Sequence, residues 1–453
     1  METTKRAVVI GASMAGLLAA RALADTYPTV TIIDRDTLPG RAENRRGVPQ
    51  GKHLHGLLAR GLTVLEELFP GFEEEMVAAG AVRADIQSEI HWYLDGHLLK
   101  PDPSGLTGIS VSRPLLEFAV RQRVAALPGV EIIDNTDVLH LLTTGDRRRV
   151  TGVGIMSRVD GSAATTVEAD LVVDASGRAS RTPVWLRELG YEPAPEVKMT
   201  VDTTYVTRLY RREPHHFGGR PATSVGGYPG SPASGTMFAI EDNVFIFTTG
   251  GIFGKQVPMD DDGLLAFTKE LPNRVYADFL PTATRLSEPV KTRYPASVRR
   301  YYEKLKEFPD RYLVVGDAIC SYNPVYGQGM SVAALEAQVL RGLLDAGADD
   351  LPKRFFRAAA KPVDTAWTIA TGADMRFPES EVTPPLVTRV LNRYLSRLYR
   401  VAADDATVAT AFLRVLNLMD TPERLLAPAV LKRVLVAKRK TLSPREKQAA
   451  EAG

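Results

Sequence analysis

The chain has 453 residues, of which 44% are hydrophobic and 24% charged, the composition of a globular protein with two or three domains. A net charge of +2 gives no reason to expect a nucleic-acid partner. The single cysteine, Cys320, excludes an intramolecular disulfide framework. Neither a signal-peptide pattern nor a membrane-length apolar run is present, so we expect a cytoplasmic protein.

The first predicted elements form a β-α-β unit. An apolar run at 7–10 predicts a buried strand, a helical pattern follows Gly16, and a second apolar run at 30–33 ends in Asp34. Gly11 and Gly16 allow a tight turn and close packing of the helix on the strand, and the N–H groups at the helix start suit a pyrophosphate. Asp34 stands where an acidic residue meets the ribose of a dinucleotide.

Ser13 occupies a position in the turn GASMAG (11–16) where a nucleotide-binding loop usually carries glycine. A serine nucleophile on a G-x-S-x-G turn is the alternative, but the residue two positions after Ser13 is Ala15. We therefore favour a dinucleotide turn in which the Ser13 hydroxyl donates to a phosphate. An ordinary α/β turn without a ligand stays open on this segment alone.

The elements that follow divide the chain into three regions. A hairpin is predicted around Asp95-Gly96, a helix from Arg113-Pro114, strands near 130–144 and 170–174, and alternating strands at 196–300 that include a turn at Asp242-Asn243. Strand, glycine turn and helix return at 311–344, and the segment from 376 is helical, with Val387, Val390, Leu391, Tyr394, Leu395 and Leu398 on one face. We predict a discontinuous nucleotide-binding domain (1–83, 105–180 and 305–375), a sheet-rich substrate domain (84–104 and 181–304) and a helical C-terminal region (376–453).

Three glycine-containing turns follow three predicted strands: GASMAG at 11–16, DASGRASR at 174–181 and GDAICSYNPVYGQGM at 316–330. This set resembles the FAD-dependent monooxygenases of the para-hydroxybenzoate hydroxylase superfamily. Ser13 departs from the first family motif, and Ala175 and Ser176 separate Asp174 from Gly177 in the second. The third motif matches fully. The resemblance implies an α/β, Rossmann-like FAD-binding domain of the glutathione-reductase type, an inserted sheet-rich substrate domain and FAD bound without a covalent link.

Within the superfamily the chain is similar to the polyene epoxidases of polyether ionophore biosynthesis, themselves similar to squalene epoxidase. The stretches that carry this resemblance are GASMAGLLAAR, GVPQGKHLHGLL and GDAICSYNPVYGQGMSVAALEA. It implies insertion of one oxygen atom from O2 through a flavin C4a-hydroperoxide, with epoxidation of alkenes in an apolar polyketide or terpenoid-like substrate of bacterial antibiotic biosynthesis. The electron donor would be NAD(P)H or a partner flavin reductase.

The expected FAD contacts come from all three motifs. Asp317 ends a predicted strand and faces the ribityl hydroxyls, while glycines after Pro324 let the backbone approach the flavin edge. The resemblance assigns Arg45 and Arg113 to the dinucleotide and the Val138 main chain to adenine; for Arg45 a solvated loop is the alternative. The full expected set is Gly11, Ser13, Gly16, Asp34, Arg35, Arg45, Arg113, Val138, Asp174, Gly177, Asp317, Pro324, Gly327, Gly329 and Met330.

No catalytic side chain is evident, because the flavin itself is the oxidant in this family. A dry pocket is expected, with Phe238, Phe245, Phe247 and Tyr326 as its candidate lining. The lack of an evident general base fits epoxidation, since a phenol hydroxylase needs a group that stabilises phenolate. The alternatives are an aromatic hydroxylase, a prenyl-chain reductase and a non-catalytic FAD-binding scaffold.

Three other interpretations are weighed and not favoured. His53 and His55 in KHLH lack a third ligand at zinc spacing, so no metal is expected. The scattered tryptophans Trp92, Trp185 and Trp367 do not form the motif of dedicated flavin halogenases. The basic tail at 431–447 suits an acidic membrane surface, but packing followed by a frayed end is favoured.

Overall fold

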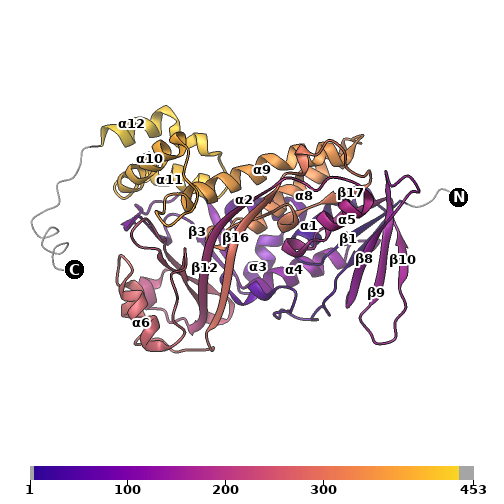
Figure 1. Cartoon of the computed structure of the whole chain (residues 1–453). Coiled ribbons are helices and arrows are strands. Elements are labelled where there is room, and N and C mark those ends of the chain that lie inside the picture. Colours follow the sequence, from indigo (N-terminus) through magenta and orange to yellow (C-terminus); the bar gives the residue numbers. More distant parts are fainter. Residues whose placement is uncertain (1–4, 438–453) are drawn as a thin grey trace, which may run out of the picture.

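The protein is described by a computed structural model over residues 5–437 (Figure 1). Its nucleotide-binding part is built on a parallel sheet in which β1 (Arg6–Ile10) lies at the centre. The sheet order is β17 (Tyr312–Val314), β11 (Leu171–Asp174), β1, β2 (Thr29–Ile33) and β7 (Val130–Ile133). Nearly every residue of β1, β2 and β11 is buried, as the apolar runs predict for strands covered on both faces.

Helices cover this sheet. In the core, α1 (Met14–Ala24) packs against α8 (Gly329–Asp345) and α4 (Arg113–Ala125). Helix α1 begins at Met14 and not after Gly16, so Gly16 lies in its first turn. A Cβ atom at Gly16 would lie 1.8 Å from the Gly11 carbonyl oxygen, which explains why glycine stands there.

Smaller elements complete the nucleotide-binding part. The helices around the sheet also include α2 (Ala59–Leu68), α3 (Phe72–Ala78), α5 (Thr182–Leu189) and α9 (Leu351–Asp374). A three-stranded sheet joins β8 (Thr136–Thr143), β9 (Val150–Ser157) and β10 (Thr165–Glu168), and β3 (Val82–Asp85) pairs with β6 (Thr107–Ser110).

The inserted segment forms an eight-stranded sheet, in which the long strands β12 (Glu196–Arg211) and β16 (Val290–Arg300) run side by side (Figure 1). The predicted hairpins at Asp95-Gly96 and Asp242-Asn243 are confirmed, and all four turn residues have positive φ. The other strands are β4 (Ile90–Leu94), β5 (His97–Leu98), β13 (Ala222–Val225), β14 (Ala233–Ile240), β15 (Val244–Gly251) and β18 (Cys320–Ser321), and α6 (Asp261–Lys269) and α7 (Val275–Phe279) pack beside them.

The C-terminal helices α10 (Leu386–Ala402), α11 (Ala406–Leu416) and α12 (Pro428–Val436) form their own core, shown in yellow beyond α9 (Figure 1). The predicted apolar face of α10 is only partly buried: Leu398 is enclosed, but Val387 is 79% exposed. None of the helices within residues 5–437 is long and apolar enough to cross a bilayer. The part of the basic tail beyond residue 437 lies outside the described residues.

Glu336 on α8 is a buried carboxyl group that supports the third glycine motif. Its Oε2 atom accepts a hydrogen bond of 2.6 Å from the Gly316 N–H, and burial raises its pKa from 4.5 to about 8. Because the folded protein holds this proton up to a higher pH than the unfolded chain, the Glu336 contribution to stability falls as pH rises from about 4.5 to about 8.

The Glu336→Gln variant should therefore gain stability over the wild type as pH rises through this window. Glutamine keeps an acceptor for Gly316 and does not ionise. The difference in the free energy of unfolding between the two proteins should grow by up to about 1.4 kcal/mol per pH unit. Urea denaturation at several pH values measures it, and a difference that stays constant with pH would contradict this assignment.

Candidate functional site

A cavity of about 1240 Å³ runs from the carboxyl ends of the parallel strands to the eight-stranded sheet and the C-terminal helices. Open α/β sheets bind their ligands at this edge. The volume exceeds the roughly 300–1,000 Å³ of a usual small-molecule site. The cavity is therefore large enough for a cofactor and a substrate together.

The turn after β1 forms one end of the cavity. Gly11 has a φ of +103°, and a Cβ atom there would lie 2.8 Å from the Ala175 carbonyl oxygen. Ser13, Met14 and Ala15 line the cavity at the start of α1, and the Ser13 side chain does not cap that helix. The first N–H groups of a helix have no intrahelical acceptors, so this end suits a phosphate group.

The Ser13 hydroxyl is held by protein groups. It donates to Glu117 Oε2 at 2.8 Å and accepts from Arg113 Nη2 at 2.7 Å, while Arg45 Nε donates to Glu117 Oε1 at 2.8 Å. Burial opposes ionisation of Glu117, but the guanidinium groups of Arg113 and Arg45 outweigh it and lower its pKa to about 2. Glu117 thus orients both arginines that are expected to contact the dinucleotide. Sequence reasoning missed it, although its spacing of four residues from Arg113 on one helix is a usable signal.

Asp34 lies at the end of β2 on the same cavity. Its carboxylate accepts hydrogen bonds from the backbone N–H groups of Ala12, at 2.6 Å, and Asp36, at 2.8 Å. Arg35 and Val138 also line this part of the cavity, the first with an exposed side chain. The expected adenosine-binding residues therefore lie together.

Two expected FAD-binding residues do not line the cavity. Gly16 is a packing position, and Asp174 is fully buried. Asp174 accepts hydrogen bonds from the Ser176 N–H, the Ser180 hydroxyl and the Thr182 hydroxyl. It therefore stabilises the second turn from the protein interior. Gly177 in that turn does line the cavity.

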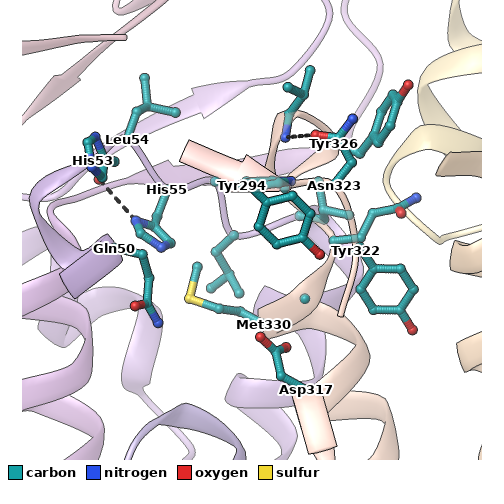
Figure 2. A pocket seen from close by; sticks show the side chains of 18 of the residues that line it. Gln50, His53, Leu54, His55, Tyr294, Asp317, Tyr322, Asn323, Tyr326 and Met330 are labelled. Atoms are coloured by element: carbon teal, nitrogen blue, oxygen red, sulfur yellow. Dashed lines mark hydrogen bonds between the residues drawn. The ribbon is translucent and has the colours of Figure 1, made fainter. Parts of the chain in front are cut away.

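The third motif forms the other end of the part of the cavity that is expected to hold FAD, here called the cradle. Figure 2 shows Asp317 and Met330 facing the same space as His55 and Gln50. No donor among the described residues lies within hydrogen-bond distance of the Asp317 side chain, and burial raises its pKa, although Arg178 and Arg113 act to lower it. The cavity thus contains a carboxyl group with unused acceptor capacity, as binding of ribityl hydroxyls requires.

Gln328 provides further unpaired polar atoms at the start of α8. It lines the cavity, is 1% exposed, and neither Nε2 nor Oε1 has a hydrogen-bond partner within residues 5–437. Buried amides normally find partners, so these atoms suit the polar edge of a bound flavin. Pro324, Gly327 and Gly329 line the same space, with Gly327 at a φ of +63°. These features fit FAD, and sequence reasoning missed Gln328.

The two histidines of KHLH form hydrogen bonds with other groups of the protein. His53 Nδ1 lies 2.8 Å from Thr207 Oγ1 and its Nε2 lies 2.7 Å from Thr292 Oγ1, while burial lowers its pKa to about 4. A neutral His53 therefore joins the loop to the eight-stranded sheet and has no ring nitrogen left for a metal. His55 lines the cavity, its Nδ1 lies 3.0 Å from the His53 carbonyl oxygen, and burial lowers its pKa to about 3.

The predicted aromatic lining is only partly right. Phe238 and Tyr326 line the cavity, but Phe245 and Phe247 do not. Successive side chains of a strand point to opposite faces, and on β15 it is Thr248 that faces the cavity. Phe245 and Phe247 instead pack in the core on the other face of the sheet.

The far part of the cavity, here called the substrate chamber, is mostly apolar. The C-terminal helices contribute to it, which the sequence did not predict. Its apolar lining includes Trp92, Leu94, Val225, Leu391, Leu395, Phe412, Leu416 and Leu425. Tyr326 lies where the chamber meets the third glycine motif, so the cradle and the chamber are continuous.

Comparisons with known proteins agree with this geometry. Residues 4–346 match the family described as "FAD binding domain". Protein Rv3254 of Mycobacterium tuberculosis is 34% identical, covering 92% of this chain and 90% of its own length. Kynurenine 3-monooxygenase of Salinispora arenicola is 26% identical, covering 90% and 84%. The fold resembles p-nitrophenol 4-monooxygenase PnpA of Pseudomonas putida, with a TM-score of 0.64 and 16% identity over 92% of this chain and 99% of that one.

Proposed function

This chain belongs to the FAD-binding monooxygenase family, similar to para-hydroxybenzoate hydroxylase, and on that premise we propose that it transfers one oxygen atom of O2 to an alkene of an apolar substrate, giving an epoxide. The observation that carries this proposal is the apolar substrate chamber, which continues directly from the flavin end of the cavity. An apolar chain suits this chamber, because apolar side chains of the eight-stranded sheet and of the C-terminal helical region line it. NAD(P)H, the donor typical of this family, or a partner reductase would supply the electrons.

The chain's own residues would position the cofactor and exclude water. FAD, when bound, supplies the two-electron chemistry that activates O2. Asp317 and Gln328 would offer the acceptors and donors that orient it, while Arg113 and Arg45, both held by Glu117, would lie on the side of its phosphates. The apolar chamber walls keep water from the reacting atoms and hold the alkene beside the flavin.

Hydroxylation of an aromatic ring is the second candidate. Two of the similar proteins are named for aromatic substrates, kynurenine and p-nitrophenol. Incubating the holoenzyme with polyenes, phenols and polyprenyl chains, with mass spectrometry of the products and O2 uptake, separates the candidates. Epoxides with one O2 consumed per product support the proposal, and ring hydroxylation without alkene oxidation supports the second candidate. A reduced prenyl chain, or no turnover of any class, would contradict both.

The Leu395→Trp variant should bind long substrates more weakly than short ones. Leu395 lines the chamber on α10, so a larger ring there fills space that the chain end needs. Overpacking costs about 1–3 kcal/mol, equivalent to an increase of roughly 5- to 150-fold in KM for the longest substrates. Val387→Trp, at a position of the same helix that is 79% exposed, is the matched control. Equal KM values for long and short substrates in Leu395→Trp would refute this placement.

A further inference from the structure

A row of hydroxyl groups crosses the face of the eight-stranded sheet that meets the cavity. Cross-strand pairing aligns four residues of four neighbouring strands, here called the hydroxyl row: Ser224 on β13, Thr236 on β14, Thr248 on β15 and Thr207 on β12. Residues opposite each other in paired strands point to the same face and lie within contact distance. Ser224, Thr236 and Thr248 line the cavity and are partly exposed.

Hydrogen bonds connect one end of the hydroxyl row to the loop that carries His53. Thr207 Oγ1 lies 2.6 Å from Thr248 Oγ1 and 2.8 Å from His53 Nδ1. His53 Nε2 lies 2.7 Å from Thr292 Oγ1 on β16, and the Leu54 N–H donates to Thr248 Oγ1 at 3.3 Å. Because His53 is neutral, its ring offers one N–H donor and one acceptor.

Either order of donors along this chain leaves Thr248 able to form one more hydrogen bond. If His53 donates to Thr207 and Thr207 donates to Thr248, the hydroxyl proton of Thr248 is free. If Thr207 donates to His53 and Thr248 donates to Thr207, the Thr248 oxygen keeps a free acceptor site, since a hydroxyl oxygen accepts two hydrogen bonds. Thr248 Oγ1 has no further partner among the described residues, so a ligand in the cavity can supply one.

The pair formed by Ser224 and Thr236 has the same property. The two hydroxyl oxygens are 3.0 Å apart, so one hydroxyl donates to the other. The second hydroxyl proton has no acceptor within residues 5–437, although both residues line the cavity. The helices α10 and α11 line the chamber with apolar side chains instead, among them Leu391, Leu395 and Phe412. The chamber therefore combines a polar row on the sheet with an apolar wall of helices.

We propose that the hydroxyl row binds oxygen substituents, as carbonyl or hydroxyl groups, on the chain whose alkene is epoxidised. The substrate is then a long unsaturated ketone or alcohol and not a hydrocarbon. This inference rests on the proposed epoxidation and specifies its substrate class. A hydrocarbon on the row would remove water from the hydroxyl groups without replacing its hydrogen bonds, whereas a carbonyl or hydroxyl group replaces them.

Ser224, Thr236 and Thr248 are the specificity-determining residues of this proposal. The apolar helices hold the hydrocarbon parts of the chain, and the row fixes where its oxygen atoms lie. The position of the oxygen atoms along the row then decides which alkene lies beside the flavin. Sequence reasoning missed the row, because its members come from separate strands that become neighbours only in the folded sheet.

The test measures binding to the oxidised holoenzyme through changes in the flavin absorbance spectrum. The probes are a long-chain trienone, the corresponding trienol and the triene hydrocarbon of the same length. In the double variant Ser224→Ala, Thr236→Val the dissociation constants of the trienone and the trienol should rise about two- to tenfold, the usual effect of one hydrogen bond. The dissociation constant of the hydrocarbon should stay the same or fall. Thr248→Val, at the other end of the cavity-lining part of the row, should act in the same way.

Thr223→Val is the matched control. Thr223 precedes Ser224 on β13 but is fully buried, does not line the cavity, and has a hydroxyl without a hydrogen-bond partner among the described residues. Its replacement should change none of the three dissociation constants. FAD content and circular dichroism verify that each variant is folded.

Three results would overturn the hydroxyl row as a binding site for substrate oxygen. They are equal weakening of all three probes, no change for any probe in the folded variants, and no binding of the trienone or the trienol to the wild type. Trienone or trienol binding that depends on the row, without epoxide formation during turnover, would count against the proposed function and leave the row standing.

Discussion

Replacing Gly16 by alanine is expected to remove most of the affinity for FAD. The new Cβ atom would lie 1.8 Å from the Gly11 carbonyl oxygen and 3.3 Å from the Ala175 side chain, so the backbone of the first turn must move. Gly11 and Ser13 in that turn line the phosphate end of the cavity. Overpacking of this kind costs about 3 kcal/mol or more when backbone atoms clash, equivalent to at least about hundredfold in the FAD dissociation constant.

The measurement is titration of the apoprotein with FAD, followed by flavin fluorescence. Gly342→Ala is the control, because Gly342 lies inside α8 and, apart from the helix backbone, no atom of residues 5–437 is within 4 Å of the position of its added Cβ. Alanine is the better helix former there, so FAD binding should be unchanged and stability the same or higher. Normal FAD affinity in Gly16→Ala would show that the first turn is not the phosphate end of the cradle.

The Asp317→Ala variant should bind FAD about tenfold to a hundredfold more weakly, because a hydrogen bond to a charged group contributes about 1.5–3 kcal/mol. The carboxyl group faces the cavity and no described residue donates to it, so its removal leaves the rest of the cradle intact. Asp345→Ala, at the exposed end of α8, is the control. An unchanged dissociation constant for Asp317→Ala would mean that the third motif does not contact the ribityl chain.

The sequence predicted the parts of the fold that depend on local patterns. The apolar runs that became β1, β2 and β11 are buried on both faces, and Asp95-Gly96 fixed the hairpin between β4 and β5 through its positive φ angles. The glycine turns could be recognised because each contains a glycine with positive φ, at Gly11, Gly177 and Gly316, and a Cβ atom at Gly11 or Gly316 would also be closer than 3.0 Å to a neighbouring atom. The FAD-binding α/β fold with an inserted sheet and C-terminal helices is confirmed.

Features that depend on tertiary contact were missed. Phe245 and Phe247 were assigned to the pocket because an apolar strand does not reveal which of its faces meets the core. The lining role of α10 depends on how the C-terminal helices pack over the chamber. Glu117 was missed for the same reason, because two of its partners, Arg45 and Ser13, lie 72 and 104 residues away in sequence.

Labelling with 18O2 shows where the oxygen atom of the product comes from. The holoenzyme is reduced without oxygen and then mixed with 18O2 and a polyene or phenol, and the product of a single turnover is examined by mass spectrometry. We expect one 18O atom in each product molecule and none from labelled water, because the oxygen comes from O2 inside a chamber that excludes water. Oxygen that comes only from labelled water, or a product without added oxygen from a protein that holds its FAD, would contradict this expectation.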